Sequence, residues 1–216
     1  MEYTRPATWA DFKTIVALAC LAAAGCSNAA PPASATPATS AVESPRQGLQ
    51  GNGCLAAGDG YLRARLRGAL QLELDWRDAQ MKCEGGPRPQ DSGLRVSIAG
   101  PDRGNDRRLR FVFGLSGVRE GAAASAVPTN VTVIFEGEQR VFATLGDDKC
   151  TVDSLQQERI GALGGPKRSY RVTARGFCTA PATNLSGDER IMVERFDFAG
   201  RIDIEDEKPH DPAQNR

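Results

Sequence analysis

The most regular pattern along the chain is an alternation of apolar and polar residues over positions 62–76. Even positions are apolar or small, from Leu62 to Trp76, and odd positions are almost all polar. A period of two residues is typical of a β-strand with one buried face. Because the phase is kept across Gly68, a two-residue turn there would pair an apolar face with a polar one. We predict one long strand bent at Gly68, with a hairpin of odd turn length as the alternative.

Shorter apolar or alternating runs follow, and most are bounded by turn residues. They predict strands at 94–98, 109–115, 131–135, 140–145 and 170–178, with another strand beginning at Cys150. The last pattern runs over 192–204. Its predicted inner face comprises Met192, Phe196, Phe198, Gly200, Ile202 and Ile204. A glycine again interrupts the apolar stripe, and we expect this last strand to pair with the first.

The remaining segments are predicted to be irregular. Stretches 81–93 and 117–129 are rich in glycine, proline or small residues and are expected to be loops, and 152–160 is expected to form at most two helical turns. About eight strands over 51–205 predict an all-β domain, a single antiparallel β-sandwich or a partly closed barrel. A domain of about 150 residues buries close to 70% of its unfolded surface, so a hydrophobic core is expected.

Residues 15–24 form an almost uninterrupted apolar run that ends in small residues. A membrane-spanning helix needs roughly 20 apolar residues, whereas this run has the length of the apolar region of a signal peptide. Residues 1–25 are therefore expected to be an export signal. The segment that follows, 26–50, is rich in Ala, Pro, Ser and Thr and predicts a disordered linker. Residues 206–216 predict a polar, disordered tail.

The sequence Leu-Ala-Ala-Ala-Gly-Cys at Leu21–Cys26 resembles the lipobox of bacterial lipoproteins. The resemblance implies that Cys26 is lipidated and becomes the first residue of the mature chain. Two or more acyl chains suffice for stable membrane anchoring. Ser27 and Asn28 lack the aspartate that retains such proteins in the inner membrane, which implies the periplasmic face of the outer membrane of a Gram-negative bacterium. The alternative is a secretory signal with an incidental cysteine. The folded part also resembles many small proteobacterial envelope lipoproteins, a likeness that implies no particular activity.

Four cysteines remain in the predicted domain, and an even number in an exported chain favours disulfides. Three pairings are possible, of which we favour Cys54–Cys83 and Cys150–Cys178. The second pair is centred on the turn-forming sequence 161–166, so antiparallel strands flanking that turn would bring the two cysteines face to face. A zinc site is the alternative, but no Cys-x-x-Cys spacing occurs and the single histidine, His210, lies in the tail. We predict no metal and no cofactor.

Charge and motifs exclude several function classes. The chain has 27 basic and 27 acidic residues, and removing the signal takes two of each, so no basic excess favours nucleic acid. No phosphate loop, dinucleotide motif or Gly-x-Ser-x-Gly motif occurs, and the predicted domain 51–205 has no histidine for a catalytic triad. We therefore predict no catalytic residues. Three carboxylate pairs could be considered as paired catalytic carboxylates, but they are better explained as turn and surface residues: Asp147/Asp148, Glu136/Glu138 and Asp203/Asp206.

Two groups of arginines are candidates for binding an anionic partner, such as a lipid headgroup or an acidic glycan. They are Arg63, Arg65 and Arg67 in the first strand and Arg107, Arg108 and Arg110 near a predicted hairpin. The alternative is cross-strand pairing with acidic residues such as Glu73 and Asp75.

These observations favour a membrane-anchored, non-enzymatic envelope lipoprotein that binds or helps to assemble an envelope protein or glycan. A carbohydrate-binding or carbohydrate-active domain is one alternative, with Trp76, Tyr170 or Phe142 as exposed aromatic residues. A ligand carrier or inhibitor with a cavity between the sheets, near the inner-face glycines Gly68 and Gly200, is another.

Overall fold

Eleven strands and one short 3-10 helix make up the part of the chain that the computed structural model describes, residues 53–89, 92–161 and 166–205. The strands are β1 (Tyr61–Gly68), β2 (Leu72–Arg77), β3 (Lys82–Pro87), β4 (Gly93–Ala99), β5 (Arg108–Ser116), β6 (Ala124–Glu136), β7 (Arg140–Ala143), β8 (Cys150–Ile160), β9 (Lys167–Cys178), β10 (Ala182–Asn184) and β11 (Arg190–Glu205). The 3-10 helix η1 covers Asp78–Gln80. The predicted signal, Cys26, the linker and the tail lie outside the described residues.

The strands pair antiparallel in one sheet that curls back on itself. Its order is β2-β1-β11-β10-β7-β6-β5-β4-β3, while β8 and β9 form a second connection between β6 and β11. The ring β6-β8-β9-β11-β10-β7 is therefore closed, and β2 and β3 are the two ends of the strand order. The predicted all-β antiparallel domain is confirmed, with eleven strands instead of about eight. None of the described residues lies in an α-helix, and no described helix is long and apolar enough to cross a membrane.

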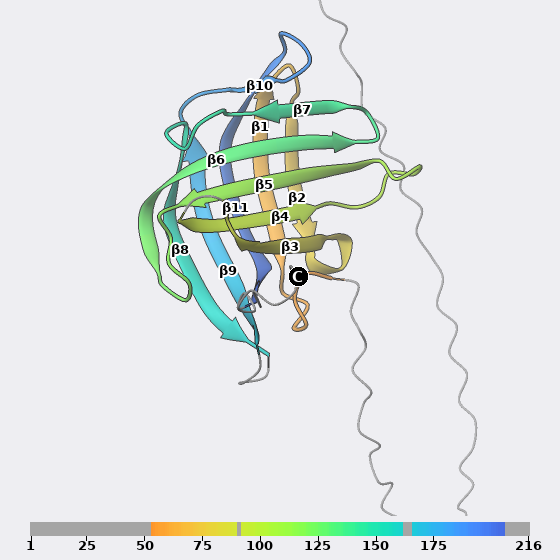
Figure 1. The fold of residues 1–216 in the computed structure, drawn as a ribbon. Helices are drawn as coiled ribbons and strands as arrows, with labels where there is room; N and C mark the ends of the chain where they lie inside the picture. The colour runs from red at the N-terminus through yellow and green to blue at the C-terminus, as the bar shows by residue number, and fades with distance from the viewer. Residues whose placement is uncertain (1–52, 90–91, 162–165, 206–216) are drawn as a thin grey trace, which may run out of the picture. The chain divides into compact units, whose positions relative to one another are not determined.

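Two layers of the curled sheet face each other across the core. Figure 1 shows β4, β5 and β6 running across β1, β11 and β9. Between the layers, the ring of Phe113 in β5 lies 4.8 Å from Phe196 and 4.6 Å from Phe198 of β11. Phe111 of β5 lies 5.9 Å from Trp76 of β2. Because side chains alternate between the faces of a strand, the outward residues of β1 and β5 lie on opposite sides of the core.

Residues 62–76 form a hairpin, so the single bent strand that we predicted is wrong. Leu62 pairs with Trp76 and Leu66 with Leu72, which leaves positions 67–71 as the turn. This odd turn length is the alternative that the pattern allowed, because it keeps even positions opposite even positions. Gly68 has a φ of 108°, and a Cβ there would lie 2.6 Å from the carbonyl oxygen of Arg190. Glycine is required for the turn and for the close approach of β11.

Three segments predicted as loops or helical turns contain strands. β3 (Lys82–Pro87) lies within 81–93, and β6 begins at Ala124, inside the predicted loop 117–129. β8 replaces the predicted helical turns at 152–160. At Gly85 of β3 a Cβ would lie 2.6 Å from the Ile202 side chain, so the glycines that suggested a loop instead let β3 pack closely on β11. Tertiary pairing outweighs local composition in all three segments.

The last strand pairs with the first, as predicted, with Phe198 opposite Leu62. The register shifts between Arg65 and Leu66 because Glu194 is an extra residue in β11. This bulge reverses the phase of the strand, so Ile191 and Val193 are buried before it and Phe196 and Phe198 after it. Met192 is only partly buried, and its predicted place on the inner face is wrong.

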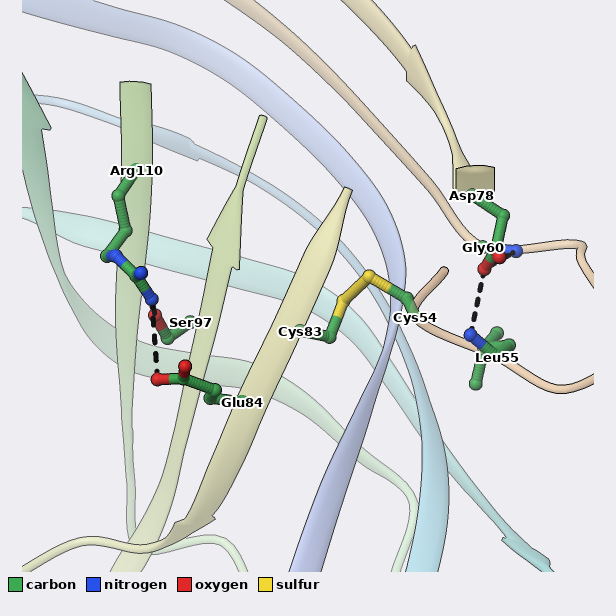
Figure 2. The surroundings of a disulfide bond; sticks show 8 residues. All are labelled: Cys54, Leu55, Gly60, Asp78, Cys83, Glu84, Ser97 and Arg110. Carbon is green, nitrogen blue, oxygen red and sulfur yellow. Dashed lines mark hydrogen bonds and ion pairs between the residues drawn. A yellow bond between two sulfur atoms is a disulfide. The ribbon is translucent and has the colours of Figure 1, made fainter. Parts of the chain in front are cut away.

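Both favoured disulfides are present, Cys54–Cys83 and Cys150–Cys178. Cys150 and Cys178 are directly opposed in the β8–β9 hairpin. Figure 2 shows Cys54–Cys83 joining the segment before β1 to β3, beside the buried Asp78. Oδ1 of Asp78 accepts hydrogen bonds from the backbone N–H groups of Leu55 (2.8 Å) and Gly60 (3.1 Å). The disulfide and this carboxylate together hold the start of the domain against the sheet.

Candidate functional site

The six arginines proposed as an anion-binding patch are not brought together. Arg63, Arg65 and Arg67 lie on the outer face of β1. Arg108 and Arg110 lie on the outer face of β5, across the core, and Arg107 is exposed in the preceding turn. Each group must therefore be judged separately.

Most of these arginines are paired with carboxylates. Arg63 lies 3.5 Å from Asp75 and 3.8 Å from Asp197, Arg65 lies 2.9 Å from Glu73, and Arg67 lies 3.7 Å from Glu194. On the other face, Arg108 pairs with Asp102 at 3.1 Å. Arg110 pairs with Glu136 at 2.5 Å and donates to Ser97 at 2.9 Å, and it reaches Glu84 at 3.4 Å, as Figure 2 shows. The cross-strand pairing considered from sequence accounts for these contacts.

The candidate carboxylates are held by neighbouring donors. Asp147 lies 3.0 Å from Arg88 and accepts a 2.6 Å hydrogen bond from Asn130. Burial raises the pKa of Asp147, but these hydrogen bonds outweigh it, and the net pKa is lowered. Asp148 lies 2.6 Å from Lys149. Asp203 accepts hydrogen bonds from Ser169 and Arg201, and its proposed partner Asp206 is outside the described residues. These contacts tie loops and strands together.

A larger polar feature crosses the outer face of β2, β1, β11 and β9. Two rows of outward side chains follow from the strand register. The first row comprises Asp75, Arg63, Asp197 and Arg175. The second comprises Glu73, Arg65 and Arg195, and Phe177 continues it on β9. Phe196 pairs with Gly176 in antiparallel strands, so Arg195, which precedes Phe196, lies beside Phe177, which follows Gly176. Between the rows lies a trough of about 440 Å³.

The floor of the trough is formed by the residues between the two rows, Leu74, Ala64, Phe196 and Gly176. The side chains of Leu74, Ala64 and Phe196 are buried in the core and Gly176 has none, so the backbone faces the trough. Asp153, at the bulge of β8, closes the end beyond β9. Three interstrand spacings make the trough about 14 Å long, and its volume falls within the roughly 300–1,000 Å³ of small-molecule sites.

The two ends of the trough differ in charge balance. At the β1–β2 end, which we call the paired half, Arg63 and Arg65 are both matched by carboxylates. Hydrogen bonding from Arg65 lowers the pKa of Glu73. Burial and a 2.9 Å hydrogen bond to Asp197 raise the pKa of Tyr61, so its phenol stays protonated and donates. At neutral pH this half presents fixed ion pairs.

At the β9–β11 end, which we call the open half, the basic groups are largely uncommitted. Arg195 is 65% exposed and its nearest carboxylate is Glu73, at 3.8 Å. Arg175 is exposed and forms no ion pair within 4.0 Å with any described residue. Phe177 is 38% exposed, the one aromatic side chain among the exposed large hydrophobic residues of the described chain. The open half thus combines two guanidinium groups with an aromatic surface.

The residues of the open half were not singled out from the sequence. The alternation in 170–178 places Tyr170, Val172, Ala174, Gly176 and Cys178 on one face, and it therefore predicts that Arg175 and Phe177 share the other. The alternation does not show that β11 brings Arg195 beside them, because that depends on the β9–β11 register. The aromatic residues considered for glycan binding are instead core residues, since Trp76, Tyr170 and Phe142 are all buried.

The ligand cavity considered from sequence near Gly68 and Gly200 is not present at either glycine. A Cβ at Gly200 would lie 3.2 Å from Sγ of Cys83 and 3.5 Å from the Ile98 side chain. Gly68 lies exposed in the β1–β2 turn. Neither glycine therefore borders a cavity between the layers.

Within the described segments, no group of three or more potential ligands could hold a metal ion. No family model matches the chain, and no curated protein or solved structure matches it. Functional inference therefore depends on the site itself.

Proposed function

We propose that this chain is an exported, lipid-anchored envelope protein whose β domain is a non-enzymatic binding module, with the trough as its binding surface. The trough is the observation that carries the binding role, because it combines a concave surface of suitable volume with uncommitted arginines and an exposed aromatic residue. The Leu21–Cys26 motif supports the anchor. The two disulfides are consistent with an extracytoplasmic protein.

The anchor is tested by producing the full chain in a Gram-negative host fed an alkyne-tagged fatty acid. We expect label on the wild-type protein and its recovery with the outer membrane. Cys26→Ser should lose the label and leave the membrane fraction while both disulfides still form. Retention of label by Cys26→Ser would contradict lipidation at this residue.

The binding surface is tested by photocrosslinking in the native cells. A photoreactive amino acid replaces Phe177 in one variant and the exposed Arg190, outside the trough, in a matched control. We expect a discrete adduct from position 177 and none from position 190. Equal yields from both positions, or no adduct from either, would contradict a binding role for the trough.

A further inference from the structure

The open half of the trough brings two arginines and a phenyl ring to one small area of the sheet. Arg195 of β11 precedes Phe196, whose partner is Gly176, and Phe177 follows Gly176 on β9. Arg175 pairs with Asp197 and is two residues from Phe177 on the same outward face. Diagonal neighbours on adjacent strands are about 7–8 Å apart, and two arginine side chains easily converge over that distance.

The charge of this area favours an anion. Asp197 lies opposite Arg175 and two residues from Arg195 on β11. It accepts a hydrogen bond from Tyr61 and lies 3.8 Å from Arg63, so it is engaged on its β1 side. Glu73 is shared between Arg65 at 2.9 Å and Arg195 at 3.8 Å, with the closer contact to Arg65. The two remaining acids of the lining are Asp75, which lies 3.5 Å from Arg63, and Asp153, at the β8 end. A carboxylate arriving from solution would therefore meet guanidinium groups whose donors are still available.

The rest of the trough favours a polyhydroxylated ligand over an apolar one. Its floor is backbone. The first row alternates acidic and basic side chains from β2 to β9, and the second row adds Glu73, Arg65 and Arg195 before Phe177. Such walls offer hydrogen-bond acceptors and donors in turn, which suits hydroxyl groups. The trough runs across strands that are already paired on both sides at β1, β11 and β9, so an extended peptide cannot bind there by adding a strand.

We propose that the trough binds an acidic oligosaccharide, with a sugar carboxylate between Arg175 and Arg195 and a sugar ring against Phe177. This inference rests on the proposed binding role of the trough and adds the chemical class of the ligand. The remaining sugar units extend over Asp197 and Arg63 toward β2, along the length of the trough. Because the contacts are partly exposed, added salt weakens the binding.

The test is calorimetric titration of the full-length acylated protein in detergent with trigalacturonic acid, compared with its uncharged methyl ester. We expect binding of the acid, at least about tenfold weaker binding of the ester, and a similar loss in Arg175→Gln and Arg195→Gln. Phe177→Ala should weaken the acid and the ester alike. Arg190→Gln, an exposed arginine of β11 outside the trough, is the matched control and should bind as the wild type does.

The results separate this inference from the proposed function. Equal binding of acid and ester, or full binding by Arg175→Gln, overturns the assignment of the carboxylate. Binding of an acidic hexapeptide without binding of the trisaccharide overturns the sugar class. In either case a crosslink from position 177 would still support the trough as the binding surface. Absence of that crosslink would instead remove the binding role itself.

Discussion

The paired and open halves of the trough have similar charged residues but differ in how many of their arginines form ion pairs. In the first row, Arg63 lies between Asp75 and Asp197 and contacts both. Arg175 lies beside the same Asp197 but contacts no carboxylate of the described residues within 4.0 Å. Asp197 is reached from the β1 side by Tyr61 and Arg63. Whether an arginine on a strand face is neutralised or available for a ligand therefore depends on which residues the strand register places beside it.

A second difference lies in what surrounds each half. Strand β2 ends the strand order and carries Glu73 and Asp75 outward, so the paired half has two acids for its two arginines. Strand β9 contributes Arg175 and Phe177 at the corresponding places in the two rows. The open half therefore has arginines that its own acids, Asp153 and Asp197, do not pair within 4.0 Å, and the paired half provides a wall of ion pairs.

The largest expected effect comes from the floor that both halves share. Phe196 is buried against Phe113, and Phe196→Ala should reduce the free energy of unfolding by about 3–5 kcal/mol. Denaturant unfolding measures the loss, and amide chemical shifts should move at both ends of the trough. Shifts confined to β9 would show that the two halves do not share one floor.

The Cys150–Cys178 disulfide should act on the open half alone. Cys178 follows Phe177 directly, so Cys150→Ser/Cys178→Ser should lower stability by about 2–4 kcal/mol and weaken ligand binding by freeing the end of β9. The double variant Cys54→Ser/Cys83→Ser is the control, because its bridge joins β3 and the segment before β1. We expect it to lose comparable stability in thermal unfolding while retaining affinity. Equal loss of affinity in both variants would contradict the division into halves.

A direct comparison within one row has a smaller effect. Arg63→Gln removes contacts to Asp75 and Asp197 and should cost less than about 1 kcal/mol of stability. Arg175→Gln removes no ion pair to a described residue and should leave thermal stability unchanged while reducing binding of an anionic ligand. If Arg175→Gln destabilises the protein more than Arg63→Gln, the contrast between the halves is wrong.

The smallest effect is the titration of Glu73. Its pKa is lowered, first by hydrogen bonding from Arg65 and then by the charge of Arg65. A carboxyl group with a lowered folded-state pKa stabilises the fold above its unfolded pKa, and this contribution disappears as pH falls through the folded value. Carbon NMR of the side-chain carboxyl should show the pKa returning toward its ordinary value in Arg65→Gln. If the pKa of Glu73 is the same in Arg65→Gln as in the wild type, the Arg65–Glu73 pairing that defines the paired half is wrong.

Much of the fold follows from local patterns. Alternation identified the regions that became β1, β2, β9 and β11, because a half-buried strand requires a period of two. The same alternation excluded a two-residue hairpin turn, although it did not distinguish a bent strand from the five-position turn at 67–71. The symmetry of 150 and 178 about a turn predicted one disulfide, since antiparallel strands oppose residues equidistant from their turn.

Other parts depended on contacts between distant segments. β3 contains Gly85 and Gly86 and resembled a loop, yet it is a strand because β4 pairs with it and β11 approaches it closely. The phase change at Glu194 required the pairing of β11 with β1 to become visible. Phe177 could have been recognised as outward from the alternation in β9, but its position beside Arg195 could not, because these residues are brought together only by the β9–β11 register.

The sequence by itself determined the all-β class, the Cys150–Cys178 pairing and the faces of most strands, because these depend on the spacing of residues within single strands and hairpins. Only the tertiary structure decided which charged residues meet. Arg63, Arg65, Arg175 and Arg195 are the same residue type in similar alternating contexts, yet the first two are neutralised and the last two are largely available. Coulombic pairing depends on distance across strands, and that distance is set by register and topology.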